Sequence, residues 1–136
     1  MSHFTTIRTE LRDKEALKKA LADLGYSEIE DGHNLPLYGY QGDRRSQTAD
    51  LVIRRQHVGG ASNDVGFALG PDGCYTAIIS EFDLHSGFQW NQKRSKLTQR
   101  YAFHTIVDTT AQQGWNVAQQ EQQQDGSIRV VVQRWR

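Results

Sequence analysis

Three residues near the middle of the chain, Glu81, Asp83 and His85, carry side chains that could support acid-base chemistry. On a β-strand, the alternation of side chains would place all three on one face, where carboxylates and an imidazole can serve as general acid and base. The alternative is an exposed polar face at the end of a strand. We favour this alternative because the sequence has no serine elbow, no phosphate-binding glycine loop and no dinucleotide-binding fingerprint.

The five histidines and the single cysteine, Cys74, are scattered along the chain. Structural zinc sites usually take their ligands in close pairs, such as Cys-x-x-Cys or His-x-x-x-His. Because no such pair occurs, we expect neither a metal site nor another cofactor. Cys74 is close to Tyr75, Ala77 and Ile78, which indicates a small buried side chain rather than a reactive thiol.

A second candidate surface combines two tyrosines with three arginines, namely Tyr38, Tyr40, Arg44, Arg45 and Arg54. Aromatic rings beside cations are typical of nucleic-acid binding, and tyrosine and arginine also anchor contacts between proteins. The bland alternative is a solvated surface. The 16 basic and 16 acidic side chains cancel, so the chain lacks the field that draws a protein to nucleic acid. We therefore prefer a protein-binding surface over residues 35–45.

A separate basic cluster, Lys93-Arg94-Ser95-Lys96, lies near the start of a predicted helix. The helix dipole disfavours cations at that end. This conflict indicates either an acidic neighbour within the fold or an acidic partner.

The hydrophobic pattern predicts the scaffold for these candidates. Asp13 is the expected N-cap of a helix that ends at Leu24, and Asn91 that of a second helix over residues 93–113. Residues 42–48 are polar and predict a loop. The predicted strands cover residues 2–9, 26–30, 35–41, 49–56, 64–69, 74–80, 117–121 and 128–135.

Asp-Gly turn signals predict antiparallel hairpins at Asp31-Gly32, Asp72-Gly73 and Asp125-Gly126. Pro36 places its strand at a sheet edge. The predicted order is β-α-β5-α-β2, that is, one strand, a helix, five strands, a second helix and two strands. This is an α+β fold with two helices on one face of a largely antiparallel sheet. The succession of helix, Gly-aromatic, strand, Asp-Gly and strand occurs twice, which suggests an internal pseudo-repeat.

Length and composition predict a single domain over residues 1–136. The opening Met1-Ser2-His3-Phe4 has no apolar run, and no stretch is long enough to span a bilayer. We therefore expect a soluble cytoplasmic protein that does not enter a membrane.

The chain resembles the family of hypothetical chloroplast open reading frame 35, also catalogued as domain of unknown function 1257. The resemblance is carried by the opening Met1-Ser2-His3-Phe4, by Leu24-Gly25-Tyr26, by Ala49-Asp50-Leu51-Val52-Ile53, by Asp64-Val65-Gly66-Phe67 and by Trp90. It implies a protein of the cyanobacterial cytosol or plastid stroma. It also implies an adaptor linked to photosynthetic physiology or to an AAA-type ATPase.

Three functional hypotheses follow from these observations. The first is a non-enzymatic accessory protein that binds another protein. The second is a module that binds a small ligand or nucleic acid on its sheet face. The third and least favoured is an enzyme built on Glu81, Asp83 and His85.

Overall fold

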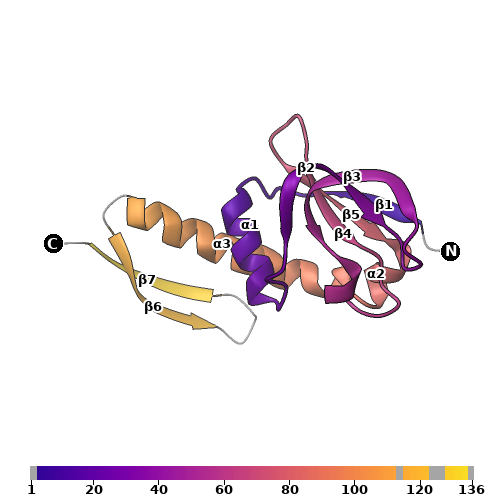
Figure 1. Cartoon of the computed structure of the whole chain (residues 1–136). Helices are drawn as coiled ribbons and strands as arrows, with labels where there is room; N and C mark the ends of the chain where they lie inside the picture. Colours follow the sequence, from indigo (N-terminus) through magenta and orange to yellow (C-terminus); the bar gives the residue numbers. More distant parts are fainter. Residues whose placement is uncertain (1–2, 113–114, 123–127, 135–136) are drawn as a thin grey trace.

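A computed structural model describes residues 3–112, 115–122 and 128–134 of the chain, with side chains up to residue 109 (Figure 1). Five antiparallel strands form the main sheet in the order β1-β5-β4-β3-β2. They are β1 (Phe4–Arg8), β2 (Glu30–Tyr38), β3 (Arg44–Ile53), β4 (Val65–Leu69) and β5 (Tyr75–Ser80). Two further strands, β6 (Trp115–Gln122) and β7 (Ile128–Arg134), pair only with each other. The predicted α+β class with an antiparallel sheet is confirmed.

The helices are α1 (Lys14–Asp23), a 3-10 turn (Arg55–His57), α2 (Glu81–His85) and α3 (Trp90–Gln112). The predicted cap of α1 is present, since the carboxylate of Asp13 accepts a hydrogen bond from the backbone N–H of Ala16 at 3.0 Å. At its other end Gly25 takes a φ of +101°, and Tyr26 N–H donates back to the carbonyl of Leu21. The glycine permits this left-handed closure.

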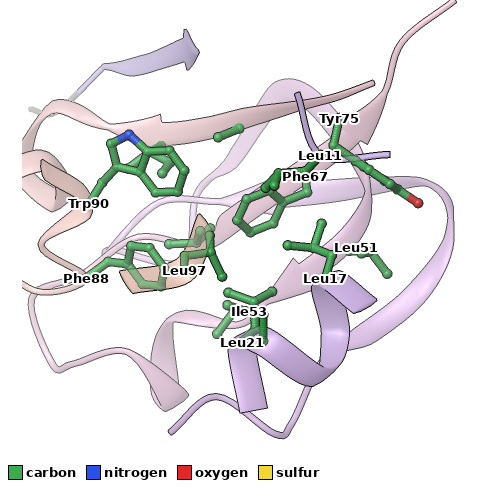
Figure 2. Close-up of a cluster of buried hydrophobic side chains, with 14 residues drawn as sticks. Leu11, Leu17, Leu21, Leu51, Ile53, Phe67, Tyr75, Phe88, Trp90 and Leu97 are labelled. Carbon is green, nitrogen blue, oxygen red and sulfur yellow. The ribbon is translucent and has the colours of Figure 1, made fainter. Parts of the chain in front are cut away.

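The main core lies between one face of the sheet and the two longer helices. Leu17 and Leu21 of α1 pack in it together with Leu51 and Ile53 of β3 (Figure 2). The first half of α3 covers the neighbouring part of the same face through Trp90 and Leu97. Other members of this cluster are Leu11, Ala20, Val65, Phe67, Tyr75, Ala77, Ile79 and Phe88.

The opposite face holds a smaller core, which the curl of the sheet encloses. Val52 lies there with Leu37, Ala49 and Ile78. Arg45 of β3 lies over the ring of Phe4, 5.5 Å from its centroid, although two other strands separate β3 from β1 in the sheet. Gly66 permits the curl, because a Cβ at this position would lie 2.8 Å from that of Ala49.

The predicted hairpin at Asp31-Gly32 is wrong. Residues 30–38 form one strand with an irregular register between Asp31 and Leu35, where Asn34 has a φ of +53°. Asp31 instead forms ion pairs with Lys14 and Lys18 of α1. The turn lies at residues 39–43, so most of the predicted loop 42–48 belongs to β3, whose polar side chains are compatible with a strand that has one wet face.

The predicted pseudo-repeat is also not equivalent in its two copies. The first helix leads into a strand of the main sheet, whereas α3 leads into the separate β6–β7 hairpin. The Asp125-Gly126 turn lies outside the described residues. In addition, α3 starts at Trp90, so Asn91 lies inside the helix and is not its cap.

An exposed cluster joins α1 to α3. Asp23 accepts hydrogen bonds from Arg100 Nε at 2.7 Å and from His104 Nε2 at 2.6 Å. Burial raises the pKa of Asp23, but the hydrogen bonds from His104 and Arg100 outweigh it, so the pKa lies below its ordinary value of 3.8. The ionised carboxylate therefore stabilises the fold.

Replacing Leu21 with alanine should destabilise the protein strongly, because this fully buried side chain would leave a cavity between α1 and β3. We expect a loss of about 2–5 kcal/mol in the free energy of unfolding, measured in urea. Glu15→Ala, on the exposed face of the same helix, is the control and should change stability little. Equal effects of the two changes would show that the buried face of α1 is assigned wrongly.

Replacing Asp23 with asparagine should reduce stability at pH 7 by about 1 kcal/mol. Because the folded-state pKa is the lower one, the stabilisation is complete above the unfolded value of 3.8 and is lost as the pH falls through the folded value. The gap between the wild type and the variant should therefore narrow in urea titrations near pH 3. A gap that does not change with pH would contradict this account.

Candidate interaction site

The proposed acid-base residues do not share one face of a strand. Residues 81–85 form the short helix α2 rather than a strand, because the hydroxyl of Ser80 caps it by accepting from the N–H of Asp83 at 3.1 Å. On a helix, residues two apart do not share a face. Asp83 is accordingly fully buried, whereas Glu81 and His85 are exposed.

The carboxylate of Asp83 is used by the fold itself. Its Oδ2 accepts hydrogen bonds from Ser80 Oγ at 2.6 Å and from the backbone N–H of Asn63 at 3.1 Å. Its Oδ1 accepts from the N–H of Phe88 at 3.0 Å. Gly87 lies directly against this cluster, since a Cβ there would come within 2.4 Å of Oδ1. Asp83 therefore fixes the turn between α2 and α3.

The loop before β4 pairs with the end of β2. Tyr38 N–H donates to the carboxylate of Asp64 at 2.9 Å, and Asp64 N–H donates to the carbonyl of Tyr38. Tyr40 N–H donates to Asn63 Oδ1 at 2.9 Å. The prediction that β2 is an edge strand is confirmed, but the backbone groups at its end are already paired.

Arg54 belongs to the same set of contacts. Its Nη1 donates to Asp64 at 2.7 Å and to the carbonyl of Pro36 at 2.7 Å, and its other nitrogens pair with Glu30. The hydrogen bond from Arg54 lowers the pKa of Glu30. The guanidinium also lies over the ring of Tyr38, so the structure brings these two proposed surface residues together as internal supports.

The other members of the predicted surface lie at or near the turn between β2 and β3. Tyr40 and Arg44 are exposed. Arg45 is largely buried and pairs with Asp43 at 2.6 Å. The structure therefore leaves Tyr40 and Arg44 as the accessible part of the proposed 35–45 surface.

The edge of β1 differs from that of β2. Backbone hydrogen bonds from Glu81 to His3 and from Thr9 to Tyr75 fix the pairing of β1 with β5. In an antiparallel ladder every second residue then turns its N–H and C=O away from the partner strand. In β1 these are Phe4, Thr6 and Arg8, and no other described residue pairs with their backbone groups on that side.

A cleft of about 260 Å³ lies beside the end of β1, between residues 7–11 and the first two turns of α3. Ile7, Leu11 and Trp90 provide its apolar part, and Arg8, Thr9, Glu10, Arg94 and Thr98 complete the lining. An adjoining polar hollow is lined by Arg12, Asp72 and Cys74 among others. Cys74 is half-buried there, and so more accessible than the sequence predicted.

The structure resolves only part of the charge conflict at the start of α3. Lys93 donates to the carbonyl of Phe88 at 2.6 Å and lies over the rings of Tyr26 and Phe88. Arg94 and Lys96 are exposed, and neither forms an ion pair with any residue in the described part of the chain. Glu10 lines the same cleft as Arg94, but no acidic side chain in the described fold forms an ion pair with Arg94.

Sequence reasoning singled out Arg94 but missed the open edge of β1. Phe4, Thr6 and Arg8 lie two residues apart on a predicted strand, but no local signal in the sequence shows on which side that strand has its neighbour. Among the described residues, no group of three or more potential metal ligands gathers. Nor is any helix in those ranges long and apolar enough to cross a bilayer.

Comparisons with known proteins match the chain to one family. The family model described as "Protein of unknown function (DUF1257)" matches residues 20–131. An uncharacterised protein ycf35 of Pyropia yezoensis is 33% identical, with 99% of this chain and 98% of the relative covered. A protein of the same description from Cyanophora paradoxa is 34% identical over 100% of this chain and 99% of the relative. No solved structure matches the chain.

Replacing Asp83 with asparagine should destabilise the fold, because an amide nitrogen would then face buried donors and leave at least one unpaired. We expect a loss of about 1–3 kcal/mol in the free energy of unfolding, measured in urea. Glu81→Gln is the matched control, since it neutralises an exposed carboxylate on the same helix. If Asp83→Asn were as stable as the control, the structural role assigned to Asp83 would be wrong.

Proposed function

This chain belongs to the DUF1257 family, which has plastid-encoded members, and we propose that it is a non-enzymatic accessory protein that binds another protein. We place the binding site at the open edge of β1. The proposed setting is the plastid stroma or the cyanobacterial cytosol, which the plastid-encoded relatives support.

The contrast between the two sheet edges carries the proposal. The end of β2 is covered by Asn63 and Asp64, whereas Phe4, Thr6 and Arg8 of β1 have outward backbone groups with no partner in the described fold. An extended segment of another protein can add to such an edge as a further strand, with main-chain hydrogen bonds supplying much of the affinity. Thr6 lies at the centre of this edge and its side chain is exposed.

The contacts of the other candidates favour this hypothesis over its two alternatives. Every acceptor of Asp83 that the structure describes faces a donor of the fold, which leaves the acid-base cluster without a free carboxylate at its centre. Arg54 is held by Asp64 and Glu30, which removes it from a surface for nucleic acid. Neither alternative gains support comparable to that of the β1 edge.

Replacing Thr6 with proline should abolish binding and leave the protein folded. The N–H that proline lacks points away from β5, so the ladder within the sheet survives, while the ring obstructs an incoming strand. The probe is a displayed library of random linear peptides, selected on the wild-type protein. Each selected peptide is then titrated against the wild type, Thr6→Pro and Thr6→Val.

Thr6→Val is the matched control because it keeps the N–H and the branched shape of threonine. Peptides that bind the edge of β1 should bind this control and should not bind the Thr6→Pro variant. Their binding should also slow the hydrogen exchange of the Thr6 and Arg8 amides, which the free protein leaves unprotected. Selected peptides that bind all three proteins equally would overturn the proposal, as would a library that yields no binders.

A further inference from the structure

We propose that the segment bound at β1 is an acidic one, with an apolar side chain that enters the cleft beside α3 and an acidic side chain that meets Arg94. This inference rests on the proposed function and adds to it the chemistry of the partner. It comes from the position, the lining and the charge of the cleft.

The position follows from the alternation of β1. Ile7 packs toward the main core, on the face that α3 covers, and it also lines the cleft. A strand added next to β1 would direct every second side chain to this same face. One of those side chains would therefore lie over the cleft between the end of β1 and the start of α3.

The size and floor of the cleft suit a side chain. Leu11 and Trp90 are almost fully buried and, with Ile7, give the cleft an apolar wall. Its volume of about 260 Å³ is below the range of roughly 300–1,000 Å³ that is usual for pockets that enclose a drug-sized ligand. An apolar side chain on an added strand fills such a space without requiring a separate small molecule.

The charge of the rim favours an acidic neighbour for that side chain. The lining contains Arg8 and Arg94 but only one acid, Glu10. Arg94 has no ion pair with a described residue. The side chain of Arg8 is 89% exposed and forms an ion pair with Asp72 at 3.5 Å. Arg94 also lies near the positive end of the α3 dipole, where a nearby negative charge is stabilised. A carboxylate on the added strand would offset the repulsion between Arg94 and the positive end of the α3 dipole.

Charge reversal tests the inference with the same displayed peptide library. Peptides selected on the wild type should be enriched in aspartate and glutamate, and Arg94→Glu should weaken them roughly fivefold, as expected for one exposed attraction exchanged for a repulsion. Lys96→Glu is the matched control, because it makes the same charge change on the same helix but Lys96 does not line the cleft. This control should retain the wild-type affinity. Raised salt should lower the affinity of the wild-type protein for the peptides until it approaches that of the Arg94→Glu variant.

Two results would overturn the inference. Selected peptides could show no excess of acidic residues, or Arg94→Glu and Lys96→Glu could bind them equally. If these peptides fail to bind the Thr6→Pro variant but still bind the Thr6→Val variant, the edge of β1 binds peptides and only the acidic preference fails. If they are indifferent to Thr6→Pro, the proposed function fails as well.

Discussion

The described fold depends on two buried carboxylates, Asp64 and Asp83, and on Asn63 between them. A buried charge is costly unless hydrogen bonds or an opposite charge compensate it. Asp64 is compensated by Arg54 and by backbone donors of Tyr38 and Arg55. Asp83 is compensated by Ser80, Asn63 and Phe88, and no cation among the described residues pairs with it. Asn63 precedes Asp64 in the chain, and its side-chain nitrogen donates to Asp83 while its side-chain oxygen accepts from the N–H of Tyr40.

This chain of hydrogen bonds positions two parts of the fold, the end of β2 and the turn between α2 and α3. On one side it ties the loop before β4 to the end of β2. On the other side Asp83 fixes the turn that places Phe88 and Trp90, and hence the direction in which α3 leaves the sheet. The paired end of β2 and the turn that leads into α3 therefore share one polar cluster.

The position of α3 has a further consequence for the surface. Its first turns cover the sheet next to β1, while its second half extends past the sheet toward β6 and β7 (Figure 1). Tyr101 accepts hydrogen bonds from the backbone of Arg12 and Asp13, so α3 also fixes the segment that connects β1 to α1. Arg94 is thereby held on a helix whose first turns line the cleft beside β1, a fixed position that would favour selective recognition of the proposed strand.

The sequence determined the features that depend on near neighbours in the chain. Asp13 capped α1, Pro71-Asp72-Gly73 turned β4 into β5, and the alternation of Leu51, Val52 and Ile53 assigned the two faces of β3. It could not determine what depends on distant partners. The same Asp-Gly pair makes a turn at Asp72 but lies within a strand at Asp31, where two lysines of α1 engage the carboxylate. Likewise, the burial of Asp83 and Arg54 and the open edge of β1 were decided only by tertiary structure, because sequence spacing does not show which backbone groups and charges will find a partner.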